Sequence, residues 1–361
     1  MSRLLLRIVR RLVLVPVVLT VCLAWLVALP ALMLPAALYS LLFERRARIL
    51  RVFSFMTVYF LLEIVSLVVL LGLWLASGLG LRMQSARAQA AHFAYMRWWL
   101  CQVETAAARL FRLRIEIEDP PAPRSGPVLV FSRHAGPGNS LMLVATLMLR
   151  YRRLPRIVML AKLQWDPFFD IIGNRLPNRF ITHRPADRDR SLRAIADLAS
   201  VTPSDGAFVL FPEGRDFTVK LRARAIESLR RKGFTGYADK AEKMLRVLPP
   251  RHGGVMAAVT AAPHADVIFV AHTVLEDVGP FGELWRRIPF ERPVTAHYWR
   301  IPAAEVPREQ EALIEWLYEW WGRIDKWIDD RIPPQDRPEP LPLGPVPSGP
   351  PEGGTAAQPQ K

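Results

Sequence analysis

The feature that most constrains this chain is a run of 32 residues, Leu12–Phe43, that contains no charged side chain. A helix of that length exceeds the roughly 20 residues needed to cross a bilayer, and the run is too long for the core of a signal peptide. A second apolar run, Val52–Leu81, has one charged residue, Glu63, which we interpret as an acid facing the partner helix. We therefore expect residues 1–81 to form an N-terminal membrane hairpin of two apolar helices.

The charges that flank these runs do not fix the orientation of the hairpin. Arginines lie on both sides of the first run, so the positive-inside rule chooses no direction; they are Arg3, Arg7, Arg10, Arg11, Arg45, Arg46, Arg48 and Arg51. Our first interpretation is a hairpin that returns to the same side of the membrane. The alternative is a re-entrant or interfacial pair, with every arginine cluster on the cytoplasmic face.

The composition of the whole chain also indicates lipid rather than nucleic acid as the partner. The net charge is +15 and 51% of the residues are hydrophobic, with the excess concentrated before Leu81. A basic protein with an apolar N-terminus is expected to meet anionic lipid. The two cysteines, Cys22 and Cys101, lie far apart, so we expect neither a disulfide framework nor a metal site, which fits a reducing compartment.

After the apolar runs, the pattern becomes that of an α/β domain. Residues 82–113 predict an amphipathic connecting helix. Short apolar strands then alternate with helical stretches, which predicts a mainly parallel sheet flanked by helices over 114–331. This domain is expected to end in a Trp-rich helix, Glu309–Arg331, packed against it, and 332–361 predict a Pro-rich disordered tail. The expected strands are Val128–Phe131, Ile157–Ala161, Arg179–Thr182, Ala207–Phe211, Val267–His272 and Thr295–Trp299, and the expected helices between them are Ser140–Tyr151, Arg188–Ser200 and Thr218–Lys232.

Two polar turns follow strand-like runs in this domain. The first, Ser132–Ser140, places His134 on a Gly/Pro-rich turn between an expected strand and an expected helix. A lone histidine in such a loop is more often structural than functional. However, a second charged turn, Phe211–Arg215, also follows an expected strand. Because loops at the carboxyl ends of parallel strands meet at one edge of the sheet, the two turns together predict a single site.

These turns resemble motifs of the glycerolipid acyltransferase family, the lysophospholipid (1-acylglycerol-3-phosphate) acyltransferases. The first motif of that family is His-x4-Asp; here His134 is followed by Asn139 in place of Asp. The third motif, Phe-Pro-Glu-Gly-Thr-Arg, is represented by Phe211–Arg215. Serine-hydrolase, P-loop and zinc-site spacings are absent from the sequence, so those classes are disfavoured.

Two further motifs resemble the same family. The second motif, a Gly-led strand that ends in Arg, is represented by Gly173 and Phe180–Arg184, which places the phosphate-binding residue on Arg184 or, in another register, on His183. A late Leu-x-Pro-Arg-x-x-Gly motif is matched by Leu248–Gly254. The resemblance covers roughly 114–301 and implies an acyltransferase-like fold with N-terminal membrane helices.

The resemblance implies a role for each motif residue. His134 is the expected general base for a hydroxyl, and Asn139 occupies the position of the family's acid. Forked arginine side chains suit a phosphate, and glycines allow the backbone to approach the acyl group. The expected phosphate- and glycerol-binding residues are Arg184, Glu213, Gly214, Arg215 and Arg251, with Glu213 on the acceptor's hydroxyls; Lys162, Gly136 and Gly138 are further candidates.

The expected activity is transfer of a fatty acyl group from acyl-CoA or an acyl carrier protein to a lysophospholipid, with 1-acylglycerol-3-phosphate as the favoured acceptor, in phospholipid synthesis. The donor is a substrate, and no cofactor is expected. The expected location is the membrane, with the catalytic domain on the cytoplasmic side. The alternative is a catalytically impaired lipid-binding protein on the same fold, because Asn139 cannot stabilise an imidazolium by charge. A channel is disfavoured because two apolar segments make a poor pore.

Overall fold

The structure, a computed structural model, describes residues 3–43, 46–118, 126–182, 184–273 and 285–332. Its centre is a sheet in the order β1-β7-β6-β2-β5-β3-β4, in which neighbouring strands are parallel except for the antiparallel pair β6 and β7. The expected mainly parallel sheet is therefore confirmed. The strands are β1 (Ile115–Glu118), β2 (Val128–Ser132), β3 (Leu154–Leu160), β4 (Arg179–Ile181), β5 (Gly206–Leu210), β6 (Asp266–His272) and β7 (Val294–Ile301).

The central strand β2 is buried on both faces, which explains why it reads as a continuous apolar run. Leu129 and Phe131 belong to the core on one face of the sheet. Val128 and Val130 belong to the core on the other face. Successive side chains of a strand point to opposite faces, so one short run contributes to two separate cores.

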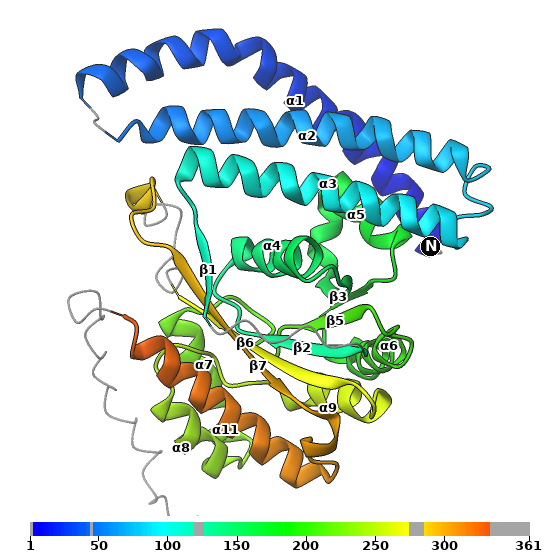
Figure 1. The fold of residues 1–361 in the computed structure, drawn as a ribbon, viewed down its shortest axis with the longest axis vertical. Helices are drawn as coiled ribbons and strands as arrows, with labels where there is room; N and C mark the ends of the chain where they lie inside the picture. The colour runs from blue at the N-terminus through cyan, green and yellow to red at the C-terminus, as the bar shows by residue number, and fades with distance from the viewer. Residues whose placement is uncertain (1–2, 44–45, 119–125, 183, 274–284, 333–361) are drawn as a thin grey trace, which may run out of the picture.

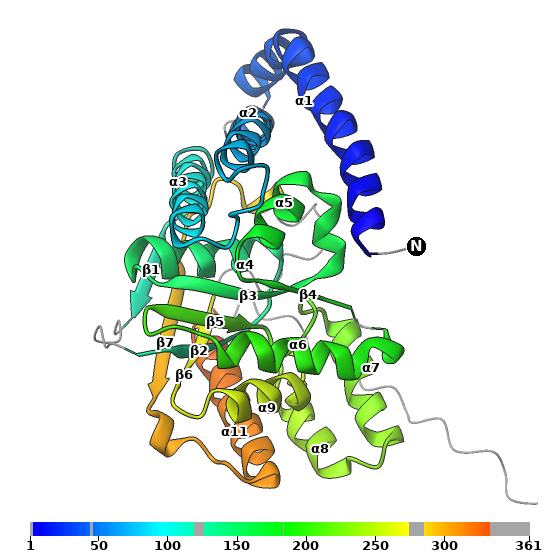
Figure 2. The same cartoon turned by 90° about the vertical axis from the view of Figure 1, so that its right-hand side faces the viewer.

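Helices cover both faces of the sheet (Figures 1 and 2). One face carries α3 (Ala86–Phe111), α4 (Pro137–Ala145) and α5 (Pro167–Arg175). The other face carries α6 (Arg188–Ser200), α9 (His252–Ala261) and α11 (Gln310–Asp329), with α7 (Val219–Arg231) and α8 (Thr235–Lys243) at its edge. As expected, the tryptophans of α11 pack against the domain: Trp321 is fully buried, and Trp316 and Trp320 lie 5.1 Å and 5.0 Å from Phe269 between ring centroids.

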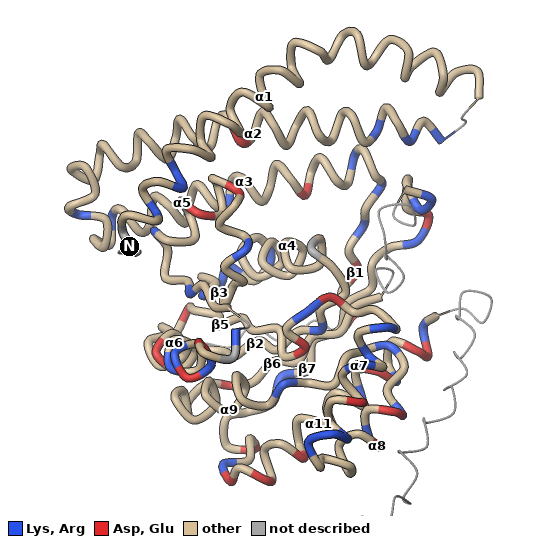
Figure 3. Tube along the Cα trace, turned by 180° about the vertical axis from the view of Figure 1, so that it is seen from behind, with Lys and Arg blue, Asp and Glu red and all other residues tan. Residues whose placement is uncertain are grey.

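Two long apolar helices, α1 (Arg3–Leu42) and α2 (Arg48–Ala76), lie beyond α3. Both are long and apolar enough to cross a membrane, and little of either is buried by the rest of the described chain. Lys and Arg residues lie toward the ends of these helices, and the long stretches between them contain no Lys or Arg (Figure 3). This distribution is a weak indication of membrane association.

The helix pair is tied to the sheet domain by buried polar contacts. Glu63 of α2, which is only 2% exposed, accepts a hydrogen bond from the backbone N–H of Phe168 at 3.2 Å, at the start of α5. Tyr59, one turn earlier in α2, donates to Asp166 at 2.7 Å, and Asp166 in turn caps α5. The acid that we expected to face the partner helix therefore binds the domain.

Candidate active site

His134 lies directly after β2, the strand between β5 and β6, and directly before α4. Its backbone is held by the turn that follows β5: its N–H donates to Glu213 at 3.0 Å, and its carbonyl accepts from Phe217 at 2.9 Å. Its ring packs at 4.6 Å from the ring of Phe211. The two turns singled out in the sequence thus meet at the carboxyl ends of two adjacent parallel strands.

Asn139 lies in the first turn of α4, and both the oxygen and the nitrogen of its side-chain amide have polar partners. Its Oδ1 accepts from the N–H of Gly136 at 3.1 Å and lies 3.2 Å from Nδ1 of His134. Its Nδ2 donates to the carbonyl of Arg133 at 2.9 Å and lies 3.1 Å from Nε2 of His272. A backbone N–H can only donate and a carbonyl can only accept, so this amide has one orientation. Nδ1 of His134 must therefore carry the proton, which leaves its Nε2 with a lone pair.

Asp216 is the carboxylate nearest this nitrogen in the described part of the site. One of its oxygens lies 3.2 Å from Nε2 of His134, and its side chain is 45% exposed. Burial lowers the pKa of His134, Asp216 and the hydrogen bond from Asn139 raise it, and the charges of Lys162 and Arg133 lower it further. No sequence motif indicates Asp216; the one available signal is its place beside Arg215.

Glu213 is only 2% exposed, and both of its carboxylate oxygens accept from backbone. One binds the N–H of His134 and the other binds the N–H of Leu248, each at 3.0 Å. Burial raises the pKa of Glu213 to about 7, against the charge of Arg133 and these two donors. Its neighbour Gly214 has φ 69°, the left-handed conformation that glycine adopts at least cost. The structure thus gives Glu213 a role in joining two loops, and its contact with acceptor hydroxyls stays a prediction.

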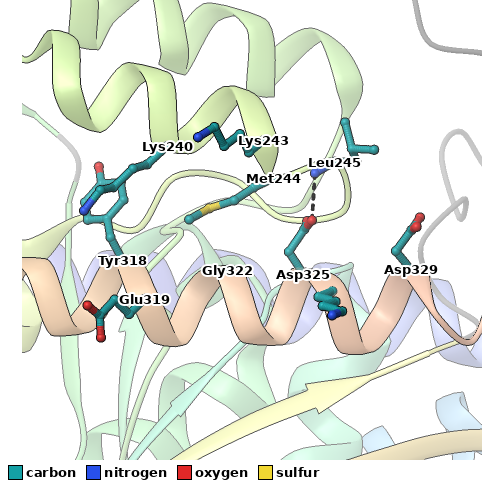
Figure 4. Close-up of a pocket in the computed structure, with 10 residues that line it drawn as sticks. Lys240, Lys243, Met244, Leu245, Tyr318, Glu319, Gly322, Asp325 and Asp329 are labelled. Carbon is teal, nitrogen blue, oxygen red and sulfur yellow. Dashed lines mark hydrogen bonds between the residues drawn. The ribbon is translucent and has the colours of Figure 1, made fainter.

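Arg133 is a fully buried residue that the motifs did not indicate. Its guanidinium donates to the carbonyl of His272 at 3.1 Å and to that of Arg246 at 2.8 Å. The segment that carries Arg246 is fixed from the other side by Asp325 of α11, which accepts from the N–H of Leu245 at 3.0 Å (Figure 4). These contacts bind β2, β6 and the 244–248 segment into one support beneath His134.

A groove of about 450 Å³ lies between α8 and α11 on the outer side of this support. It is lined by Lys240, Lys243, Met244, Leu245, Tyr318, Glu319, Gly322, Asp325, Lys326 and Asp329 (Figure 4). Neither His134 nor any expected phosphate-binding residue is among them. We therefore assign the groove no part in the chemistry.

The expected cations are brought together only in part. Burial lowers the pKa of Arg251, and the charge of Arg215 lowers it further, so the two guanidinium groups lie within electrostatic reach of each other. The backbone supports this proximity, because the N–H of Arg251 donates to the carbonyl of Pro212 at 2.9 Å. Arg184 follows β4, the edge strand, which is separated from β5 by β3. His183, its alternative, lies outside the described residues.

The remaining candidates lie around His134. Lys162, in the 3₁₀ turn after β3, is close enough for its charge to lower the pKa of His134. Gly136 and Gly138 face open space, since a Cβ added at either would meet no atom within 4 Å among the described residues. Gly138 is exposed at the start of α4, where N–H groups favour an anion, whereas Gly136 is buried and its N–H donates to Asn139.

The part of the chain that matches a known protein family contains this site. Residues 114–274 match the family model described as Acyltransferase. No curated protein matches the chain significantly. Among solved structures, the chain is similar to the crystal structure of the 1-acyl-sn-glycerophosphate (LPA) acyltransferase, PlsC, from Thermotoga maritima, with 15% identity, a TM-score of 0.43, and coverage of 75% of this chain and 99% of that one. Residues 114–274, which carry β2, β5 and the turns around His134, therefore form an acyltransferase-family domain.

Proposed function

We propose that this protein transfers a fatty acyl group from acyl-CoA or an acyl carrier protein to the free hydroxyl of a lysophospholipid, with 1-acylglycerol-3-phosphate as the favoured acceptor. The observation that carries the proposal is the placement of His134. Its Nε2 has a lone pair and lies at the edge of the sheet that also carries the neighbouring cations Arg215 and Arg251. A base beside a hydroxyl and cations for a phosphate are the parts that this transfer needs.

The proposed reaction has two proton movements. The acceptor's hydroxyl oxygen attacks the thioester carbonyl carbon while its proton passes to Nε2 of His134. The tetrahedral intermediate then collapses, the carbon–sulfur bond breaks, and His134 returns the proton to the leaving thiolate. Asn139 holds the ring through Nδ1 throughout, and Arg215 and Arg251 bind the acceptor's phosphate.

We further propose that residues 1–81 hold the domain at a membrane, that 82–113 connect them to it, and that the catalytic domain of 114–331 faces the cytoplasm. The support is the length, composition and exposure of α1 and α2. A lipid acceptor fits this arrangement, because its single acyl chain stays in the bilayer while its phosphate reaches the site. The proposed tail, 332–361, lies outside the described residues apart from Ile332.

A second candidate function is lipid binding without efficient catalysis. Two observations favour it. Asn139 offers no charge to the imidazolium that forms on His134, and the nearby carboxylate, Asp216, lies against Nε2, the nitrogen that must face the acceptor. In a comparable hydrolase triad, exchanging Asp for Asn lowers kcat by about 10⁴.

Acyl transfer in membranes separates the two candidates. Membranes that contain the full-length protein should convert labelled acyl-CoA and a lysophospholipid to diacyl product, and a panel of lysolipids identifies the acceptor. His134→Ala should lower turnover by about 10²–10⁴-fold, the usual contribution of a positioned base. An active protein that tolerates His134→Ala would contradict the mechanism. A folded, lipid-binding protein without turnover on any donor or acceptor would support the second candidate.

A further inference from the structure

The environment of Asn139 contains a second histidine that no motif indicates. His272 is the last residue of β6, the neighbour of β2, and it is buried. Its Nε2 lies 3.1 Å from Nδ2 of Asn139, although the two residues are 133 positions apart in the chain. Asn139 therefore lies between two imidazole rings, with His134 at its oxygen and His272 at its nitrogen.

The four groups around the Asn139 side chain form two matched pairs. Its oxygen faces two donors, the N–H of Gly136 and Nδ1–H of His134. Its nitrogen faces two acceptors, the carbonyl of Arg133 and Nε2 of His272. An amide has one accepting end and one donating end, so it satisfies all four groups. A carboxylate accepts at both ends, and its second oxygen would face the Arg133 carbonyl and a ring lone pair without a hydrogen between them.

The protonation state of His272 fits this pairing. Burial lowers its pKa to about 3, with a further contribution from the charge of Arg133. The ring is thus neutral at physiological pH and can present a lone pair at Nε2. Its Nδ1 has no hydrogen-bond partner among the described residues.

We infer that His272 is a positioning residue for His134, acting through Asn139. His272 accepts from the Asn139 amide beside the Arg133 carbonyl, so it adds a second acceptor that favours an amide at position 139, and that amide holds His134 in the tautomer that leaves Nε2 unprotonated. The inference deepens the proposed function, since it explains how the site orients its base without the family's carboxylate. We therefore do not expect Asn139→Asp to increase activity, although it places the family's Asp at position 139. One oxygen of the new carboxylate would face two acceptors, the carbonyl of Arg133 and Nε2 of His272.

The first test reads the tautomer of His134 and needs no activity. Full-length protein with ¹⁵N-labelled histidine is prepared in lipid nanodiscs, and two-bond proton–nitrogen correlation spectra are recorded, with His134→Ala to assign the signal. His134 should carry its proton on Nδ1. His272→Leu removes one of the two acceptors of the Asn139 amide, which weakens its hold on Nδ1 of His134 and should give a mixture of tautomers, whereas His272→Gln, whose amide reaches the place of Nε2, should give a smaller change. The matched control is His92→Leu, an equally buried histidine in α3, which should leave the His134 signal unaltered.

The second test measures coupling between positions 139 and 272 in acyl-transfer turnover. Asn139→Asp should lower turnover roughly tenfold when His272 is present, in line with one mismatched buried polar group. It should cost less in the His272→Gln background, because the glutamine amide can turn and donate to the new carboxylate. A His134 tautomer unchanged in His272→Leu, or equal losses for Asn139→Asp in both backgrounds, would overturn the inference. If no variant transfers acyl groups, the proposed function fails while the tautomer spectra still decide the role of His272.

Discussion

His134 has a different kind of partner on each ring nitrogen. Asn139 accepts at Nδ1 and carries no charge, while Asp216 is charged and lies at Nε2. An imidazolium at Nε2 would form an ion pair with Asp216, and this pair competes with the acceptor's hydroxyl for the same nitrogen. Because burial lowers the pKa of His134, the neutral base is favoured over that ion pair near neutral pH. Asp216 raises the pKa of His134 and therefore raises the pH below which His134 is protonated and no longer acts as a base.

The first prediction concerns the acidic limb of the pH profile. His134 acts as a base only when neutral, so activity rises as the pH passes upward through its pKa. Asp216 raises that pKa, and Asp216→Asn removes the anion. The acidic limb of kcat/KM should therefore move to lower pH in Asp216→Asn. Asp239→Asn, an exposed carboxylate of α8, is the control and should leave the limb in place. A limb that moves to higher pH would show that Asp216 does not act on His134.

The second prediction concerns the acceptor's phosphate. Arg215→Ala should raise the KM of the acceptor more than that of the acyl donor, because Arg215 and Arg251 are neighbouring cations that we propose bind the phosphate. Loss of a charged hydrogen bond costs roughly 1.5–3 kcal/mol when the site is partly buried. Initial rates at varied acceptor and varied donor give the two constants. Arg224→Ala, an exposed cation of α7, should change neither. Unchanged acceptor kinetics in Arg215→Ala would remove Arg215 from the site.

At the scale of elements, the site depends on loops and short helices that pack closely. Glu213 joins the turn after β2 to the 244–251 segment, and Asp325 of α11 holds that segment from outside. On the other face, the start of α5 lies against the middle of α2, and α5 packs over β3 and β4. Gly173 lies within α5 at this contact. A Cβ there would lie 2.7 Å from Cζ of Phe180 and 2.9 Å from Cε of Met159.

The third prediction follows from this close approach. Gly173→Val should destabilise the domain by roughly 1–3 kcal/mol, because extra volume in a packed contact forces neighbours to shift. Thermal unfolding of the purified protein in one detergent should show a Tm several degrees below that of the original protein. Gly236→Val in α8, where a Cβ meets nothing within 4 Å, is the matched control and should change the Tm little. Equal Tm values for the two variants would contradict the packing that we describe.

At the scale of the whole molecule, the start of α1 and the connection from α1 to α2 both contact the sheet domain. Arg10 and Arg11, near the start of α1, both bind the carboxylate of Asp170 in α5. Arg48, the first residue of α2, donates to the carbonyl of Ile288 at 3.0 Å, and Arg46, just before it, pairs with an exposed acid of the same region. A hairpin whose first helix starts at one body and whose connection is bound to the same body cannot place that connection across a bilayer from it. We therefore favour the re-entrant or interfacial alternative over the spanning hairpin.

The fourth prediction tests this arrangement. In inside-out vesicles, an impermeant maleimide should label Arg46→Cys as readily as Glu227→Cys, an exposed position of α7. Both variants are made with Cys22 and Cys101 replaced by serine. The protein should also stay with the membrane in carbonate and leave it in detergent, because α1 and α2 expose long apolar faces. Protection of Arg46→Cys would restore the spanning hairpin. Release by carbonate alone would contradict integral association.

The sequence alone predicted the elements whose burial is uniform or strongly periodic. β2 and β5 are buried at every position, so they read as apolar runs that end in polar turns. α6 begins and ends where its pattern predicted, at Arg188 and Ser200. Elements with weaker patterns were missed: β1 is a partly exposed edge strand, and α5, α8 and α9 are short. These elements are only four to ten residues long, so local periodicity carries little signal.

The meeting of the turns around His134 and Phe211–Arg215 followed from the sequence, because parallel strands bring their carboxyl ends to one edge. The partners of His134 did not follow from it. Asp216 reaches Nε2 across two loops, and His272 reaches Asn139 from 133 residues away. Such contacts depend on which strands become neighbours in the sheet, and strand order is decided by the packing of the whole domain. The sequence therefore determined the candidate residues for the chemistry, and only the tertiary structure decided which groups orient and charge them.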